Sequence, residues 1–353
     1  MKVPLTINDF LDRAATVYPD RVAVVDEPNQ PAAPLKTITY REMADIRRQM
    51  GVAMDKLGIP MGARVVMVSH NSARLLASFW GVGGNGRIFV PVNFRLSAEE
   101  VSYIIDHCGA EALLIDPELE EALADVTCKH KWIIGEESDA VWLGHEGEPE
   151  PWTPDEDAIA SINYTSGTTA RPKGVEQTHR ARWINATTFG WHTGVNDRDV
   201  YMHTLPMFHC DGWGMGYAVT AMGVKHVVIR SIDGAEILRR VDEHGVTMLC
   251  GAPAVVAAVL DAAKDLERRD SRTRQGSHRC RRGTSADSHD RGRRDRTGLG
   301  IHPAVWTHRN RSPAHDQPLP VRVGRSHSWG SRQEARPPGR PSTGRQDEGF
   351  GDG

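Results

Sequence analysis

The sequence predicts an α/β protein in which parallel-rich sheets are covered by helices on both faces. Short apolar runs that suit buried strands alternate with segments whose apolar residues recur every three or four positions, as in amphipathic helices. This alternation implies right-handed crossovers between parallel strands. It continues to about residue 266 and then stops, so we expect a partial α/β domain over residues 1–270 and a different kind of segment over residues 271–353.

The expected elements follow one another closely. Strands are predicted at residues 21–25, 65–68, 88–92, 112–115, 132–134, 159–163, 201–205, 227–230 and 246–250. Helices are predicted at residues 8–17, 40–57 and 72–80, after Ser97, and at residues 178–188, 235–243 and 254–266. Thr39 with Glu42, and Ser97 with Glu100, form capping boxes that mark two helix starts. No run of about 18 apolar residues could form a membrane span.

The cysteines and the N-terminus indicate a cytoplasmic protein. Five cysteines are scattered along the chain without a C-x-x-C pair, so neither a disulfide framework nor a zinc site is predicted. The first residues, MKVPLTINDFLDRAA, lack the apolar core of a signal peptide. A reducing cytosol fits both observations.

A dense cluster of polar and glycine residues lies between Tyr164 and Arg180, in the string YTSGTTARPKGVEQTHR. Hydroxyl groups and glycines in a turn let donors surround a polyphosphate, here Thr165, Ser166, Gly167, Thr168, Thr169 and Gly174. Lys173 adds a positive charge. The helix predicted after Thr178 would place the positive end of its dipole near the phosphates. The order is not that of a Walker loop, because the lysine precedes the second glycine.

The ordered string TSGTT…PKG resembles the phosphate-binding signature of the adenylate-forming superfamily, which includes acyl-CoA synthetases, luciferases and peptide-synthetase adenylation domains. Ala170 stands where that family most often has glycine. About 40 residues later, LPMFHCDGWG resembles the superfamily's second core motif, an aromatic and histidine turn beside the acyl pocket. Taken alone, His209 would be a structural histidine. Cys210 and Asp211 do not complete a triad or a metal site with it, because adjacent side chains diverge.

The resemblance implies a fatty-acid-CoA ligase. Such enzymes join a carboxylate to ATP, giving an acyl-adenylate and pyrophosphate, and then transfer the acyl group to coenzyme A, with Mg²⁺ accompanying ATP. It implies that the β- and γ-phosphates are held by Thr165, Ser166, Gly167, Thr168, Thr169 and Lys173. Lys173 would offset the charge that builds on the leaving pyrophosphate. His209 would border the acyl pocket, whose wall would include Trp213, Gly214, Gly251 and Ala252.

The composition changes abruptly after residue 270. Residues 1–270 carry 8 Lys, 18 Arg and 38 acidic residues (net −12), whereas residues 271–353 carry 17 Arg, no Lys and 8 acidic residues (net +9). Only 7 of the latter 83 residues are Leu, Ile, Val or Phe, so we expect this tail to be disordered. Arg-rich tails can bind nucleic acid. Arginine without lysine also arises when a GC-rich gene is translated out of frame, and we favour that explanation, so nucleic acid is not an expected partner.

The codons of the tail can be tested for a shifted frame, in which the last two bases of each codon join the first base of the next. Trp306 followed by Thr307 then forces a glycine, and residues 299–310 permit W-E-F-I-Q-L-Y-G-L-T-E-T. This string contains Y-G-x-T-E, the next core motif of the superfamily, which carries its metal-binding glutamate. Residues 281–287 permit A-G-A-P-P-P-T just before it. We infer a frameshift between about Asp270 and His278.

The leading hypothesis is therefore the N-terminal portion of an acyl-CoA synthetase with an out-of-frame tail that leaves the chain inactive. Two alternatives stay open within the resemblance. One is a ligase that passes the acyl group to a carrier protein, and the other is a non-catalytic remnant that binds nucleotide. Acyl chain length and oligomeric state are not predicted.

The frameshift hypothesis predicts the nucleotide sequence around codons 265–280. Shifting the frame near codon 275 should open a reading frame that spells the Y-G-x-T-E motif and continues into a C-terminal domain with a catalytic lysine segment. Sequencing this region of the gene is the measurement. A stop codon within a few codons of the shift would contradict the hypothesis.

Overall fold

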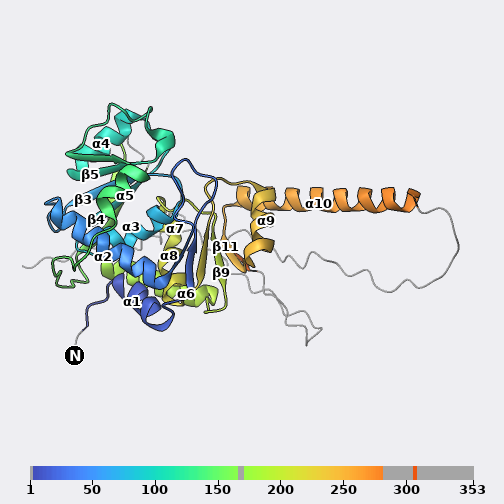
Figure 1. Ribbon diagram of the computed structural model, residues 1–353, viewed down its shortest axis with the longest axis horizontal. Helices are drawn as coiled ribbons and strands as arrows, with labels where there is room; N and C mark the ends of the chain where they lie inside the picture. The colour runs from blue at the N-terminus through green and yellow to red at the C-terminus, as the bar shows by residue number, and fades with distance from the viewer. Residues whose placement is uncertain (1–2, 166–170, 281–304, 308–353) are drawn as a thin grey trace, which may run out of the picture.

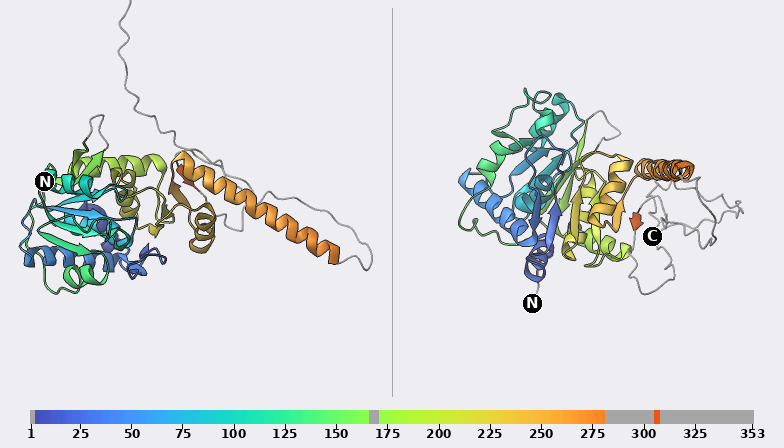
Figure 2. Two further views of the ribbon diagram at one scale, coloured as in Figure 1. Left: turned by 90° about the horizontal axis from the view of Figure 1, so that it is seen from above. Right: turned by 45° about the vertical axis from the view of Figure 1, so that its right-hand side comes forward.

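The computed structural model describes residues 3–165, 171–280 and 305–307, with side chains up to residue 266 (Figure 1). Within these residues the strands form two six-stranded sheets. Helices pack on the sheets, and the last helix runs away from the body of the molecule in all three views (Figures 1 and 2). The predicted α/β class with parallel-rich sheets is confirmed.

The first sheet is parallel except at one edge. Its strands lie in the order β6 (His130–Ile133), β5 (Ala110–Ile115), β3 (Arg64–Val68), β4 (Ile88–Val92), β7 (Ile159–Thr165) and β8 (Lys173–Thr178). Only the last pair, β7 with β8, is antiparallel. The parallel strands therefore end along one edge of the sheet, where ligand sites of open α/β sheets are usually found.

The second sheet has a parallel centre and antiparallel edges. Its strands lie in the order β12 (Val305–Thr307), β11 (Met248–Cys250), β9 (Val200–His203), β10 (Lys225–Val228), β1 (Val22–Val25) and β2 (Thr37–Thr39). The four central strands are parallel, and β2 and β12 run opposite to their neighbours. The sheet thus combines segments from both ends of the described chain.

The helices begin and end largely where local sequence signals predict. They are α1 (Asn8–Val17), α2 (Tyr40–Lys56), α3 (Ala73–Gly83), α4 (Ala98–Cys108), α5 (Glu136–Trp142), α6 (His179–Thr193), α7 (Cys210–Trp213), α8 (Met215–Ala221), α9 (Gly234–His244) and α10 (Pro253–Cys280), with a 3₁₀ turn at Pro117–Leu119. Both predicted capping boxes are present, at the starts of α2 and α4. Their reciprocal side-chain bonds satisfy backbone N–H groups that a helix start leaves unpaired.

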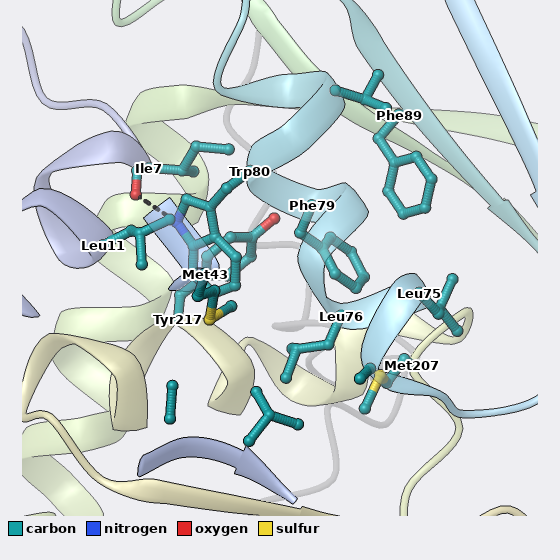
Figure 3. Close-up of a cluster of buried hydrophobic side chains, with 14 of the residues drawn as sticks. Ile7, Leu11, Met43, Leu75, Leu76, Phe79, Trp80, Phe89, Met207 and Tyr217 are labelled. Carbon is teal, nitrogen blue, oxygen red and sulfur yellow. Dashed lines mark hydrogen bonds between the residues drawn. The ribbon is translucent and has the colours of Figure 1, made fainter. Parts of the chain in front are cut away.

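Helix α3 lies at the centre of the core. All of its residues are buried, and its apolar side chains belong to a cluster that also contains residues of both sheets, such as Val24 in β1 and Val65 in β3. Trp80 is enclosed by Ile7, Met43 and Tyr217 (Figure 3), and its indole N–H donates to the Ile7 carbonyl at 2.9 Å. The bond satisfies the one polar group of a side chain that is otherwise apolar.

The sequence did not predict strands β2, β8 and β12, helices α5, α7 and α8, or the 3₁₀ turn, and one helix is longer than predicted. Strand β2 and helix α5 are short and lack a clear apolar period, and β8 lies in the segment predicted to be a turn. Helix α10 was expected to end near residue 266 and continues to Cys280. Low apolar content argues against a packed core, but arginine and glutamine can continue an exposed helix. Disorder of the remaining tail stays a prediction, because residues 281–304 and 308–353 lie outside the described residues.

A buried ion pair ties the second sheet to α9. Arg240, 2% exposed, places Nη2 2.7 Å from the Glu27 carboxylate just after β1, and its Nη1 donates to the Val228 carbonyl in β10. Removing one partner of such a pair leaves an uncompensated buried charge. Packing of α9 on the sheet edge therefore depends on this pair.

Glu27→Gln should lower the free energy of unfolding by about 1–3 kcal/mol, because the buried Arg240 would lose one of its two carboxylate partners and keep only Glu236, 2.7 Å from its Nε. Urea denaturation measures the change. Glu243→Gln, which removes an exposed partner of Arg239 on the same helix, is the matched control. Equal unfolding midpoints for the two variants would contradict the role assigned to Glu27.

Candidate functional site

The predicted phosphate-binding segment is a hairpin, and the structure describes its neck. Thr165, the last residue of β7, pairs with Lys173, the first residue of β8, and Tyr164 pairs with Gly174. Lys173 and Gly174 therefore lie in a strand, contrary to the predicted turn, because the antiparallel ladder begins directly after Pro172. The predicted residues Ser166, Gly167, Thr168 and Thr169 lie outside the described residues.

The neck of the hairpin presents a free positive charge beside a hydroxyl group. Lys173 is exposed, and among the described residues no carboxylate lies within ion-pairing distance of it. Helix α4 supports the hairpin, since the Tyr164 hydroxyl lies 2.8 Å from His107 Nδ1 and the Arg171 guanidinium lies over the Tyr103 ring. The loop between Thr165 and Lys173 is thus held at both of its ends.

The dipole of helix α6 does not point at this loop. Thr178 caps α6 by accepting a hydrogen bond from the Ala181 N–H, as predicted. Thr178 also pairs with Ile159, at the opposite end of β7 from Thr165. Because β8 separates Lys173 from the helix, about 20 Å of strand lies between them. The prediction that the positive end of the helix dipole lies near the phosphates is therefore wrong.

The His209 turn has an unusual backbone. Five consecutive residues, 210–214, have positive φ angles between 48° and 74°, and three of them are not glycine: Cys210, Asp211 and Trp213. Left-handed conformation costs a non-glycine residue roughly 1–2 kcal/mol. Such strain persists only where surrounding contacts hold it.

A buried polar network holds this turn. The Asp211 carboxylate lies 2.7 Å from Arg182 of α6 and accepts hydrogen bonds from Ser161 Oγ at 3.1 Å and Asn163 Nδ2 at 2.9 Å. The Asp211 side chain is 0% exposed and that of Arg182 is 6% exposed. Arg182 also donates to Asn163 Oδ1 and Ser161 Oγ. Every member of the network has charged or polar partners, as burial requires.

Adjacent residues of the turn do diverge, as the sequence suggested. His209 and Cys210 are exposed, with Cys210 Sγ 3.9 Å from His209 Nε2, whereas Asp211 points inward. The three do not form a triad. Across the part of the chain that the structure describes, no group of three His, Cys, Asp or Glu residues could hold a metal ion.

The predicted acyl-wall residues lie near the turn but do not enclose a cavity in the described residues. Trp213 is half-buried with its ring edge toward Phe189, and Gly214 is buried against Asn185. Gly251 and Ala252 directly follow β11, beside Thr204, whose hydroxyl donates to the Cys250 carbonyl. The adjoining cavity, about 10 Å³, is lined by Leu76, Phe79, Trp80, His203, Met207, Asp211, Gly216 and Tyr217.

The sequence did not point to the residues that hold the His209 turn in place. Asp211 was considered only as a neighbour of His209, and Arg182 was not considered at all. One signal was available, because Ser161 and Asn163 are polar at alternating positions of an otherwise apolar strand. Period-two polarity in a buried strand indicates a polar partner on one face.

Two buried histidines lie behind the turn. His203, at the end of β9, places Nε2 2.8 Å from Nδ1 of His226 in β10, and His226 Nε2 lies 3.0 Å from the Thr220 hydroxyl. Burial lowers the pKa of His226 to about 3 and lowers that of His203 well below its usual value. Both rings are therefore neutral at physiological pH.

Comparison with solved structures defines the class of fold. The structure superposes on the inhibitor-bound N-terminal domain of FACL13 from Mycobacterium tuberculosis with a TM-score of 0.65, at 27% identity, covering 71% of this chain and 64% of that one. A long-chain-fatty-acid-CoA ligase from Archaeoglobus fulgidus gives 0.68 at 21% identity, covering 75% and 55%. The fold is that of the N-terminal domain of adenylate-forming enzymes.

The family follows from the sequence comparison: the chain belongs to the AMP-binding enzyme family, whose profile matches residues 11–294. It is 32% identical to a long-chain-fatty-acid–CoA ligase from Thermus thermophilus, over 74% of this chain and 50% of that protein. It is 30% identical to 4-hydroxybutyrate–CoA ligase 2 from Metallosphaera sedula, over 72% and 49%. The chain spans about half the length of these relatives. The family profile extends past residue 270 to residue 294 and does not test the domain boundary that the sequence predicts at residue 270. That boundary therefore stays a prediction.

The histidine pair predicts a loss of stability in mild acid. Below about pH 6.5 the unfolded chain binds protons that buried His203 and His226 cannot accept, so the free energy of unfolding falls as the pH falls. His226→Gln should reduce this slope by up to about 1.4 kcal/mol per pH unit between pH 6 and pH 4. Urea denaturation at several pH values measures the slope.

The control for this prediction is His192→Gln, which changes an exposed histidine of α6. It should leave the slope unchanged. If both variants keep the wild-type slope, proton uptake by His226 on unfolding does not contribute to acid sensitivity.

Proposed function

We propose that this family member is an acyl-CoA synthetase that uses ATP to convert a carboxylic acid, in the leading case a fatty acid, to an acyl-adenylate and then to an acyl-CoA. The observation that carries the proposal is the hairpin that ends in Thr165 and Lys173 around the TSGTT loop, within an AMP-binding fold. Support also comes from relatives named as CoA ligases for long-chain fatty acids and for 4-hydroxybutyrate.

The residues of the hairpin would act on the phosphates. The exposed ammonium of Lys173 has no carboxylate partner among the described residues, so it is free to offset the negative charge that grows on departing pyrophosphate. The half-buried Thr165 and the loop residues Ser166, Gly167, Thr168 and Thr169 would donate hydrogen bonds. Each contributes to rate only as far as it stabilises the transition state more than bound ATP.

The proposed reaction also needs Mg²⁺ and a site for the acyl group. Mg²⁺ would accompany ATP as part of the resemblance to the family, and among the described residues no group of three His, Cys, Asp or Glu side chains could hold a metal ion. His209, Trp213, Gly214, Gly251 and Ala252 would border the acyl group at the ends of β9 and β11. Coenzyme A is the proposed acyl acceptor.

The activity of this chain depends on how residues 271–353 are translated. If residues 271–353 are translated out of frame, the Y-G-x-T-E motif is not expressed, and groups that act as one unit leave little activity when several are lost. We therefore propose a truncated, inactive form in which nucleotide binding survives. The described helices include none that could cross a membrane, and the scattered free cysteines favour a cytoplasmic location.

Two alternatives give different outcomes in the same assays. A non-catalytic nucleotide-binding protein would bind ATP but stay inactive even when the frame is restored. A ligase for a carrier protein would form acyl-adenylate in the restored frame but would not transfer the acyl group to free coenzyme A.

The 353-residue chain should show no carboxylate-dependent ATP–pyrophosphate exchange with a series of fatty acids, whereas a frame-restored chain should show it. Exchange of labelled pyrophosphate into ATP is the measurement. Robust exchange by the 353-residue chain would overturn the proposed inactivity, and absence of exchange by the restored chain would overturn the ligase assignment.

Lys173→Ala should weaken ATP and pyrophosphate binding by about tenfold or more, because a hydrogen bond to a charged group contributes about 1.5–3 kcal/mol. Isothermal titration calorimetry of the 353-residue chain measures the affinity. Lys264→Ala, which removes an exposed lysine of α10, is the control. Equal affinities for both variants would mean that the hairpin lysine does not contact the phosphates.

A further inference from the structure

A second cavity lies between the first sheet and the helices that cover one of its faces. It has a volume of about 30 Å³, and the residues that line it come from α2, α3, α5, β3 and β5 and include Ile46, Met50, Met67, Leu114 and Trp142. Helix α2 packs against both α3 and α5 (Figure 1). The neighbours of Met67 in β3, Val66 and Val68, belong to a different cluster, which packs with α4 on the opposite face. This Trp142 cavity and the helix that supports the hairpin are therefore on opposite faces of the sheet.

Two buried hydrogen-bond donors in the wall of the Trp142 cavity have no partner among the described residues. Arg74, at the start of α3, is 9% exposed and directs Nε and Nη2 to the Asp139 carboxylate, with Nε 2.8 Å from Oδ1. Its third nitrogen, Nη1, is buried and makes no hydrogen bond to any described residue. The same is true of Nε1 of Trp142, which is 3% exposed. Because a buried donor without a hydrogen bond is costly, both groups call for an acceptor atom in the cavity.

The charges around the cavity favour a neutral acceptor. Among the described residues that line it, only Arg74 and Asp139 carry a charge, and they form a one-to-one ion pair whose charges cancel. A bound anion would leave one uncompensated negative charge in apolar surroundings, and a bound cation would face N–H groups. A carbonyl oxygen has no net charge and two lone pairs, which is enough to accept from both Arg74 and Trp142.

The rest of the wall favours a ligand with a hydrocarbon part. Most of the lining side chains are apolar, and Met67 and Leu114 among them are almost fully buried. The hydroxyl groups of Ser78 and Ser138 already donate to main-chain carbonyl groups. A single water needs two to four polar partners and about 10–15 Å³ of space. The cavity offers about 30 Å³ and few polar partners, so a small organic molecule suits it better than water alone.

We propose that the Trp142 cavity binds a short neutral carbonyl compound, such as a ketone or an ester, whose oxygen accepts hydrogen bonds from Arg74 and Trp142. The alkyl groups of the ligand lie against the apolar side chains of α2, β3 and β5. Leu35, Ile46 and Leu143 in the wall are half-buried, so the cavity lies close enough to the surface for such a molecule to enter. The site is independent of the proposed function, because the described residues of the hairpin and of the His209 turn do not line it.

The test is a titration of the 353-residue chain with butanone, followed by NMR of the indole N–H and methionine methyl groups. Nine tryptophans and eleven methionines give few enough signals to separate, and loss of one signal in Trp142→Phe identifies that of Trp142. Butanone should shift the signals of Trp142, Met50 and Met67 in a saturable way, with the Trp142 N–H moving downfield as it donates to the ketone. Met202 and Met248, in the second sheet, should not shift. Equal shifts at all of these methionines would mean non-specific binding and would overturn the proposal.

Propionate is the matched control ligand, because it has as many heavy atoms as butanone and differs chiefly in its charge. It should bind at least about tenfold more weakly, since the ion pair leaves no counter-charge for it in the cavity. Equal or tighter binding of propionate would contradict the neutral class of ligand. If butanone causes no saturable shift at Trp142, Met50 and Met67, the cavity holds water only and the proposal is wrong. Both outcomes are read from the wild-type chain and need no variant.

Two variants test the wall of the cavity. Trp142→Phe keeps an aromatic ring and removes the N–H donor, so butanone binding measured at Met50 and Met67 should weaken by about twofold to tenfold, as loss of one neutral hydrogen bond predicts. Ala77→Val adds methyl groups that occupy the cavity and should abolish saturable binding. Trp191→Phe, which changes a tryptophan of α6 that is 85% exposed, should bind butanone as wild type does. Unchanged affinity in Trp142→Phe would refute the role of this donor, and if that variant does not fold, Ala77→Val and the comparison with propionate decide.

Discussion

Ion pairs buried between the two sheets fix how the sheets lie relative to each other. Arg230, just after β10 of the second sheet, places Nη2 2.6 Å from Asp116, which follows β5 of the first sheet, and both side chains are under 10% exposed. Asp211, in the turn that follows β9 of the second sheet, forms another buried pair with Arg182 of α6 and accepts hydrogen bonds from Ser161 and Asn163 of β7 in the first sheet. Buried pairs add little net stability, but a misplaced sheet would leave their charges unpaired at high cost. They therefore select one arrangement of the strand ends, which is where the candidate site lies.

Local signals predicted most of the fold because they act within a few residues. The capping boxes of Thr39 and Ser97, and the apolar runs of β3, β4 and β7, specify elements before any tertiary contact forms. The elements that the sequence did not predict depend instead on pairing with another segment. Strand β2 exists through its pairing with β1, and β8 through its pairing with β7. Neither pairing leaves a pattern in the strand's own residues.

The candidate site likewise has a part that could be predicted from sequence and a part that could not. The ordered string around Lys173 and the His209 motif could be found from sequence, since both are contiguous. The Asp211 network joins residues 161, 163, 182 and 211, and no local rule predicts that an arginine of α6 meets an aspartate of the turn. Nor does spacing predict left-handed angles at Cys210 and Trp213, which follow from tertiary contacts. The sequence therefore indicated which motifs carry the proposed chemistry, and the structure showed which contacts hold the His209 turn.

The pairing of β12 with β11 has a consequence for the solubility of the chain. Val305–Thr307 pair with Met248–Cys250 as an antiparallel strand, and the hydrogen bonds between paired strands join backbone groups that every residue except proline carries. A three-residue segment from near the other end of the chain can therefore cover the edge of β11. An uncovered edge recruits strands from other molecules. In this chain, β12 would thus protect β11 from strand pairing with another molecule.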